Sequence, residues 1–310
     1  MSVKPSIAVI VPCHNEERSI ASVVAALRAA LPEAVVYACD NNCTDKTQEL
    51  ARAAGAIVLA EPRQGKGNAV RSMFAAIEAD IYVLIDGDGT YDASAAPAMI
   101  RLLLNQNLAM VVGRRVHLES GAYASGHLWG NRLFSGAVAR LFGTTFTDIL
   151  SGYRVCSRKF VKSFPSFAEG FEIETELTVH ALTLRLPVRE ISTPYLARQA
   201  GSVSKLHKYR DGFRILLEIF SLVQNERPLA FFSTIGLSLF VLAIILAWPI
   251  VITFTQTHTV PRFPTAILAT GISVSGFVSV ACGLILDNVS RGRREAKLLA
   301  YLASSASIST

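Results

Sequence analysis

The chain has 310 residues, which is enough for one large α/β domain and a smaller appendage. Its formal net charge of +6 could suit nucleic acid, but the basic residues gather near the C-terminal apolar segments, where attraction to anionic lipid headgroups accounts for them more simply. The five cysteines lack metal-ligand spacing, so composition and charge point away from both a nucleic-acid-binding protein and a zinc module.

The first hundred residues alternate short apolar runs with segments of helical periodicity. The apolar runs predict buried strands at residues 7–11, 35–39, 57–59 and 81–85. Helical spacing predicts intervening helices at residues 16–31, 44–54 and 66–79. A later apolar run predicts one more strand at residues 109–112. This order favours an α/β fold with a doubly wound, mainly parallel sheet.

Polar residues follow each of the first four predicted strands. They occupy residues 13–16, 40–42, 61–63 and 86–88. Ligands of doubly wound sheets bind beyond the carboxyl ends of the strands. We therefore expect these four groups to converge on one binding crevice.

Asp86 and Asp88 lie two positions apart, directly after the strand predicted at 81–85. Two such carboxylates can hold a divalent cation beside phosphates, because Mg²⁺ and Mn²⁺ prefer oxygen ligands and keep positions open for diphosphate oxygens. The adjacent Gly87 and Gly89 would let the backbone approach a ligand closely. Asp-x-Asp also occurs in surface turns without function, and it is the position after a buried strand that favours the metal site.

Four motifs, in order, resemble those of the family 2 glycosyltransferases, in the branch that is similar to dolichol-phosphate mannose synthase and acts on polyprenyl phosphates. They lie at residues 11–17, 40–47, 65–69 and 86–88. The resemblance extends to the end of the second apolar segment and implies a GT-A-like nucleotide-sugar fold. The contacts that it implies to the nucleotide sugar come from Pro12, Asn15, Glu16, Asp40, Asn42, Lys66, Asp86 and Gly87. It further implies that Asp86 and Asp88 hold the metal, with Asp88 the firmer ligand.

Two further segments resemble the acceptor region of the same family. Residues 148–154 are similar to its Asp-x-x-Ser-Gly-aromatic-Arg block, and residues 198–206 to its Arg-x-x-Gly-x-Ser-Lys element. The second match has one extra residue, which leaves Ser202 as an alternative counterpart to Ser204. Thr90 stands where some relatives carry an amide side chain, which departs from their metal-ligand set.

The acceptor chemistry follows from the lipid phosphate that this resemblance implies. A phosphate monoester has a second pKa of about 6, so near neutral pH it is already a nucleophilic dianion, whereas a hydroxyl acceptor would need a base. The groups expected to hold this phosphate are Arg114, Arg132, Arg154, Arg198, Ser204 and Lys205. Each basic residue could instead be a solvated surface residue. Asp148, placed with Asp88 and Arg114 in the catalytic set, could act as a base or orient an arginine.

Two segments without charged residues, 229–254 and 265–286, are each long enough to cross a hydrocarbon core of about 30 Å as a helix. The alternative is a pair of buried helices in a soluble core. A short linker with two prolines predicts an antiparallel hairpin. Arg227 and the basic residues at 291–297 flank the pair while the linker has only Arg262, which predicts that both termini face the cytoplasm.

The expected organisation is a cytoplasmic glycosyltransferase domain at 1–228, a transmembrane hairpin at 229–290 and a basic cytoplasmic tail at 291–310. The N-terminus has no secretory signal pattern. An apolar face at residues 211–223 either packs on the sheet or lies in the membrane interface. Its position directly before the first span favours the interface.

These features predict an enzyme of the inner (plasma) membrane that uses Mg²⁺ or Mn²⁺ to transfer one hexose, with inversion, from a UDP- or GDP-sugar to a polyprenyl phosphate such as undecaprenyl phosphate. The sequence lacks the Gln-x-x-Arg-Trp element of processive synthases, which favours a single transfer. The alternatives are a transferase acting on a hydroxyl of a glycolipid or polysaccharide precursor, and a non-catalytic membrane scaffold. We also expect membrane lipids as partners and no nucleic acid, while the oligomeric state stays open, although hairpins of this kind can associate through small residues.

Overall fold

The computed structural model describes residues 4–117, 136, 146–165, 170, 172–196, 220–221 and 223–304. The predictions for Arg132, Arg198, Ser204 and Lys205, and most of the helix predicted at 211–223, lie outside the described residues. The chain folds as two compact units. They are Met1–Gly212 with Ala296–Thr310, and Phe213–Glu295.

The first unit is built on a seven-stranded sheet with the strand order β3-β2-β1-β4-β6-β5-β7. The strands are β1 (Ile7–Cys13), β2 (Val35–Asp40), β3 (Ile57–Ala60), β4 (Ile81–Leu84), β5 (Met110–His117), β6 (Arg154–Ser157) and β7 (Val188–Tyr195). The helices of this unit are α1 (Ile20–Ala30), α2 (Thr47–Ala53), α3 (Lys66–Ala76), α4 (Ala96–Asn105), α6 (Arg158–Ser163) and α7 (Ile173–Thr183).

The predicted parallel half of the sheet is confirmed. Strand β1 pairs in parallel with β2 and β4, and β2 pairs in parallel with β3. Strand β6, which has no clear apolar run, was not predicted; it lies antiparallel between β4 and β5. Strand β7 then pairs in parallel with β5, which leaves the sheet mainly parallel.

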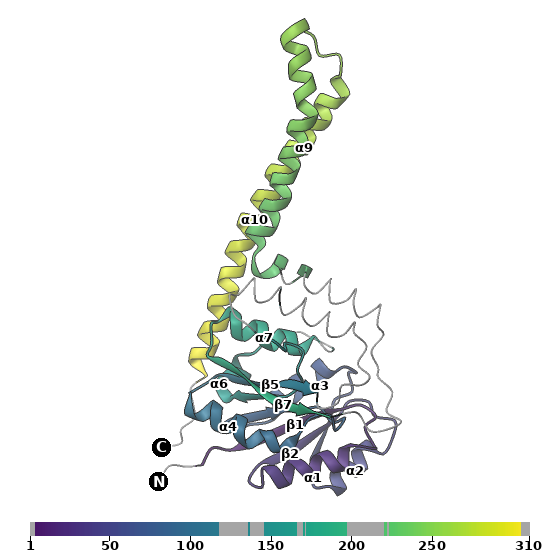
Figure 1. Ribbon diagram of the computed structural model, residues 1–310, viewed down its shortest axis with the longest axis vertical. Coiled ribbons are helices and arrows are strands. Elements are labelled where there is room, and N and C mark those ends of the chain that lie inside the picture. The colour runs from purple at the N-terminus through teal and green to yellow at the C-terminus, as the bar shows by residue number, and fades with distance from the viewer. Residues whose placement is uncertain are drawn as a thin grey trace. The chain divides into compact units, whose positions relative to one another are not determined.

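Both faces of the central strands are covered, which explains why β1 is a continuous apolar run. Helices α1, α2 and α4 cover one face, and α3, α6 and α7 cover the other (Figure 1). Consecutive residues of β1 therefore point into opposite cores, and Val9 and Ile10 are both fully buried. This packing holds the carboxyl ends of the parallel strands at one edge of the sheet.

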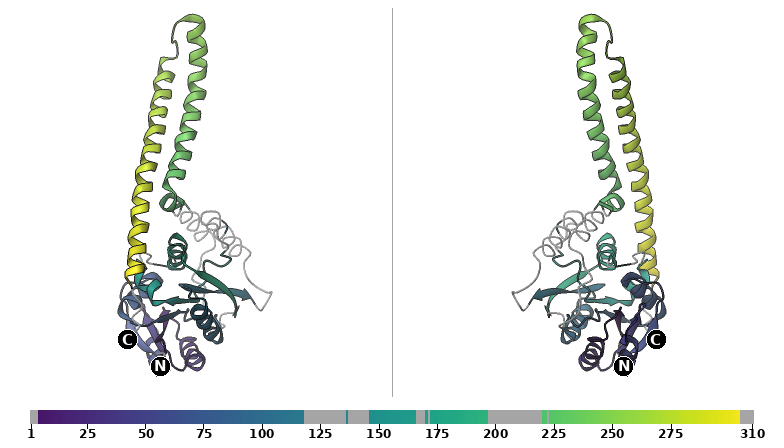
Figure 2. Two further views of the ribbon diagram at one scale, coloured as in Figure 1. Left: turned by 90° about the vertical axis from the view of Figure 1, so that its left-hand side faces the viewer. Right: turned by 90° about the vertical axis from the view of Figure 1, so that its right-hand side faces the viewer.

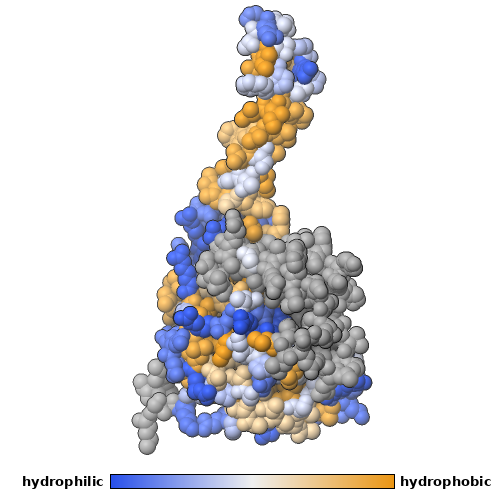
Figure 3. All heavy atoms as spheres, in the orientation of Figure 1, coloured by the Kyte–Doolittle hydropathy of each residue, from blue (hydrophilic) through white to orange (hydrophobic). Residues whose placement is uncertain are grey.

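The second unit contains two long antiparallel helices, α9 (Pro228–Thr257) and α10, whose full extent is Phe263–Ala303 (Figure 2). By length and composition, both could cross a membrane. Apolar side chains dominate the middle of the pair, and polar ones gather around the loop that joins the helices (Figure 3). Helix α10 continues through the predicted basic tail, because that segment is rich in helix-forming residues and an Asp287–Arg291 ion pair of 2.9 Å spans one turn.

Glycines allow close contact between α9 and α10. A Cβ atom on Gly236 would lie 2.7 Å from Val280 Cγ2 and 2.9 Å from the Gly276 carbonyl oxygen. Next to this crossing, Phe240 and Phe277 meet edge to face at 4.7 Å. A glycine is therefore required at position 236 because α10 approaches so closely, and not because of the backbone conformation of Gly236.

We expect Gly236→Leu to separate the two helices, because already its Cβ atom would overlap α10. Gly271→Leu is the matched control, since a Cβ there meets nothing within 4 Å. Thermal unfolding of the full chain in detergent should show a clear loss of stability for Gly236→Leu and little change for Gly271→Leu. Equal midpoints for the two variants would contradict this packing.

His180 is a buried residue of α7 that packs against the aromatic rings of α6 and of the residue that follows it. Its ring meets Phe160 and Phe164 edge to face, each at 5.4 Å. Its Nε2 atom is 3.3 Å from the Ser163 hydroxyl, and its Nδ1 atom has no hydrogen-bond partner among the described residues. Burial, and then the charge of Lys297, lower the pKa of His180 to about 4.

The lowered pKa of His180 predicts that the folded state loses stability as the pH falls. The unfolded chain binds this proton near pH 6.5 and the folded chain only near pH 4, so stability present above pH 6.5 is lost as the pH falls toward 4. We expect His180→Phe to remove about 2 kcal/mol of the stability difference between pH 7 and pH 5, measured by denaturant unfolding. His258→Phe, in the exposed loop, should leave that difference unchanged.

Candidate active site

A largely buried ion triplet lies where β4 ends. Lys66, the first residue of α3, places its Nζ atom 2.5 Å from Asp86 Oδ1 and also contacts the Glu174 carboxylate of α7. The turn before Lys66 depends on Gly65, whose φ of 134° strongly favours glycine. Three elements distant in sequence thus meet at one ammonium group.

The charges in this triplet support one another. Burial alone would lower the pKa of Lys66, but Asp86 and Glu174 outweigh it, so the pKa is raised and the ammonium stays charged. Burial raises the pKa of Glu174, and Lys66 opposes that shift. Glu174 was not assigned to the site from the sequence, and the structure shows that its carboxylate reaches it through Lys66.

The loop before β6 approaches Asp86 from the opposite side. A Cβ atom on Gly152 would overlap the Asp86 carboxylate, so no larger residue fits there. The Gly152 amide donates to the Tyr91 hydroxyl at 2.8 Å. The motif glycine is therefore required for close approach to the predicted metal and nucleotide residue.

Asp88 is buried and held in a fixed orientation. Its Oδ1 atom accepts the Thr90 amide at 3.1 Å and the Thr90 hydroxyl at 2.6 Å. The turn is fixed further by Ser19, whose hydroxyl donates to the Gly87 carbonyl at 2.7 Å, and by Gly89, whose φ is 74°. Thr90, which stands where some relatives have an amide side chain, thus orients Asp88.

The donor set suits a metal that arrives with phosphates better than a permanent metal centre. Among the described residues, no three His, Cys, Asp or Glu side chains are grouped so as to hold an ion. Asp86 and Asp88 supply hard carboxylate oxygens, and Mg²⁺ in particular is bound by one or two carboxylates together with substrate phosphates. The predicted assignment of these two residues fits the chemistry and stays a prediction.

Asn41, directly after β2, links the end of its strand to the segment that follows β3. Its side-chain amide donates to the carbonyls of Glu61 at 3.0 Å and Arg63 at 2.7 Å. Its side-chain oxygen accepts the Gly65 amide at 2.6 Å. No local pattern in the sequence ranks Asn41 above its neighbours, because its role depends on bonds to residues at least 20 positions away.

The residues predicted to contact the nucleotide sugar lie around Asn41. Asp40 accepts the Cys43 amide at 2.9 Å, and Asn15 accepts the Thr44 amide at 2.8 Å. Asn15 and Asn42 adopt left-handed backbone conformations, with φ of 54° and 59°. Pro12 pairs with Cys39 in the sheet, and the Glu16 amide donates to Thr47 at 2.8 Å. The structure thus brings the predicted group to one edge of the sheet.

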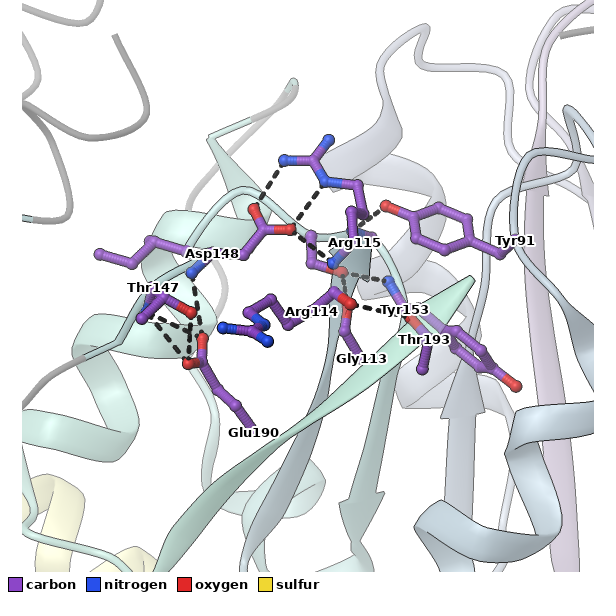
Figure 4. A network of polar contacts seen from close by, with 12 residues as sticks. Tyr91, Gly113, Arg114, Arg115, Thr147, Asp148, Tyr153, Glu190 and Thr193 are labelled. Carbon is purple, nitrogen blue, oxygen red and sulfur yellow. Dashed lines mark hydrogen bonds and ion pairs between the residues drawn. The ribbon is translucent and has the colours of Figure 1, made fainter. Parts of the chain in front are cut away.

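Asp148 is tied to an arginine that the sequence did not single out (Figure 4). Arg115 donates to it from its backbone amide at 3.0 Å, from Nε at 2.8 Å and from Nη2 at 2.6 Å. The Asp148 carboxylate outweighs the effect of burial and raises the pKa of Arg115. Asp148 is thus bonded to an arginine, as the second of its two predicted roles requires, but the partner is Arg115 and the role itself stays a prediction.

Arg114 points to the other face of β5, is exposed, and donates to the Ser192 hydroxyl at 2.7 Å. The prediction that Arg154 holds the acceptor phosphate is wrong in this structure, because its side chain is fully buried. Arg154 donates instead to the carbonyls of Ile149 and Ser151, at 2.6 and 3.0 Å, and so holds the backbone of the loop before β6.

Comparison with known proteins agrees with this geometry. The model of the family described as "Glycosyl transferase family 2" matches residues 8–164. Glycosyltransferase AglJ of Haloferax volcanii is 34% identical over 237 residues, which cover 76% of this chain and 78% of that protein. The dolichyl-phosphate hexose transferase of the same organism is 27% identical over 221 residues, covering 71% of this chain and 95% of that protein.

Solved structures show the same fold. Glucosyl-3-phosphoglycerate synthase from Mycobacterium tuberculosis, in complex with Mn²⁺, UDP-glucose and phosphoglyceric acid, has a TM-score of 0.56 at 25% identity. The match covers 69% of this chain and 79% of that chain. Fold, ordered motifs and relatives agree: the chain belongs to glycosyl transferase family 2.

Proposed function

We infer that this glycosyltransferase moves one hexose from a UDP- or GDP-sugar to a polyprenyl phosphate at the cytoplasmic face of a membrane, with inversion at the anomeric carbon. The observation that carries the choice of a phosphate acceptor is the Asp148–Arg115 pair. The named activity of the dolichyl-phosphate hexose transferase and the two apolar helices support the same acceptor.

The donor is assigned to the edge formed by the first four strands. Asp40, Asn15 and Asn42 surround the position for the nucleoside, and Asp86, Asp88 and Lys66 lie where a diphosphate would enter. A divalent cation held by Asp88 and Asp86 would neutralise negative charge on the departing diphosphate. Lys66, which stays protonated, adds a fixed positive charge on the same side.

The acceptor step needs no base in this proposal. A phosphate oxygen forms a bond to the anomeric carbon with its own electron pair, while the bond from that carbon to the diphosphate oxygen breaks and its electron pair leaves with the nucleotide. Asp148 accepts three hydrogen bonds from Arg115, so a role in proton removal would require breaking a paired, buried contact. Exposed Arg114 is a candidate for holding the acceptor phosphate.

The alternative is a transferase that uses a sugar hydroxyl as acceptor. Such an acceptor keeps its proton at neutral pH, so the reaction would need a carboxylate able to accept it. Asp148 is the first residue of the acceptor-region segment 148–154, but its carboxylate is already paired with Arg115. This commitment favours the phosphate acceptor.

Asp88→Asn should lower kcat at least about 100-fold, since it removes one of the two charged oxygen ligands beside the leaving group. Asp80→Asn is the matched control, because Asp80 lies next to the opposite end of β4 and accepts bonds from Ser6. Turnover would be measured with Mg²⁺ or Mn²⁺, a panel of nucleotide sugars and polyprenyl phosphate. Full activity of Asp88→Asn would favour the non-catalytic scaffold.

The acceptor itself is tested by offering wild-type protein polyprenyl phosphate or the corresponding polyprenol. We expect product only from the phosphate, with a rate that falls below about pH 6 as the acceptor takes up its second proton. Asp148→Asn should keep a measurable rate and the same fall near pH 6. A product from polyprenol, or complete loss of turnover with normal donor binding in Asp148→Asn, would favour the hydroxyl acceptor.

A further inference from the structure

We propose that Glu190, on strand β7, is a positioning residue that sets the Asp148–Arg115 pair and through it the rate of transfer. The inference rests on the proposed function for its kinetic consequences. Its structural basis is a chain of contacts that runs from β7 to the Asp86 site, and Figure 4 shows its first part, from Glu190 to Arg115.

Glu190 binds the start of the loop that carries Asp148. Its two carboxylate oxygens each accept the Thr147 amide at 3.0 Å, and Oε1 also accepts the Asp148 amide at 3.0 Å. The Thr147 hydroxyl donates to Oε2 at 2.8 Å. Two successive amides and one hydroxyl therefore converge on one carboxylate, which fixes the backbone from which the Asp148 side chain projects.

The position of Asp148 then determines that of Arg115. Because Asp148 accepts both Nε and Nη2, the guanidinium plane is held in one orientation. Arg115 lies over the Tyr195 ring, 5.6 Å from its centre, and Tyr195 meets Tyr91 edge to face at 5.1 Å. Tyr91 accepts the amide of Gly152, the residue packed against Asp86. A shift of this loop would therefore displace Arg115 and, through the tyrosines, the surroundings of Asp86.

The face of β7 that carries Glu190 also lies beside Arg114. Glu190 and Ser192 are two positions apart on β7, so they share a face, and their strand partners are Val112 and Arg114. The Glu190 carboxylate is thus diagonal to Arg114, at a spacing that long side chains can bridge. The loop donors instead bind the carboxylate, and Arg114 donates to Ser192. The Glu190 carboxylate is thus bound by the loop amides of Thr147 and Asp148, and Arg114 is bound by Ser192 instead.

A double-mutant cycle tests the proposal with full-length protein in detergent. We expect Glu190→Gln, which loses the charge and one acceptor oxygen, to lower kcat about tenfold with the donor KM within about twofold, and Asp148→Asn to lower kcat about thirtyfold. If Glu190 acts through Asp148, the double variant should stay near the thirtyfold loss. Independent effects would multiply to about three-hundredfold, and that result would overturn the proposal.

Two controls separate positioning from folding. Glu33→Gln changes an exposed glutamate paired with Lys4, and its effect should simply multiply with that of Asp148→Asn. If Glu190→Gln does not fold, Thr147→Val enters the same cycle, since it removes one of the bonds to Glu190 and keeps both amides. A multiplicative effect of Thr147→Val would then count against the proposal.

A readout without turnover separates this proposal from the proposed function. In Glu190→Gln the amides of Thr147, Asp148 and Arg115 should exchange hydrogen at least about tenfold faster than in wild type, with amides of β1 unchanged. Wild-type protein that makes no product from any donor would sink the proposed function alone. Unchanged exchange at all three amides would sink the positioning role, whatever the reaction.

Discussion

The parallel pairing of β1 with β2 and β4 is the constraint on which the rest of the structure depends. Because parallel strands end at the same edge, the pairing of Cys13 with Asp40, and of Ile10 with Leu84 two residues before Asp86, places both acidic segments together. Ladder bonds continue past the strands, as the Asn41 amide donates to the Cys13 carbonyl. The donor side is therefore a direct product of buried strands that expose only their ends.

The proposed acceptor side is built in a different way, from contacts between charged side chains of β5, β6 and β7 and the loop before β6. Arg154 holds the loop carbonyls, Arg115 holds the Asp148 side chain, and Glu190 holds the loop amides. These contacts favour a single arrangement, because breaking any one of them would leave a charged group that is at least partly buried without its hydrogen-bond partners. One side of the site is thus positioned by the sheet, and the other by a charged network.

This difference explains what the sequence could predict. The strands β1 to β4 and the donor residues at their ends follow from apolar runs and their ordered motifs, which are local signals. Strands β6 and β7, and the roles of Asn41, Arg115, Glu174 and Glu190, depend on contacts across 20 to 108 positions that no local pattern reveals. Arg154 was misassigned because its motif lies in a short strand whose alternation turns the side chain toward α7.

The Lys66 ammonium has a consequence for how the protein withstands metal shortage. In proteins whose metal ligands are bare carboxylates, losing the ion leaves repelling charges and often unfolds the site. Here Lys66 already offsets Asp86 and Glu174, so the fold carries its own counter-ion. If Asp86 and Asp88 hold a divalent cation as proposed, a cell short of that cation would keep a folded enzyme, because this part of the fold does not need the metal to balance its charges.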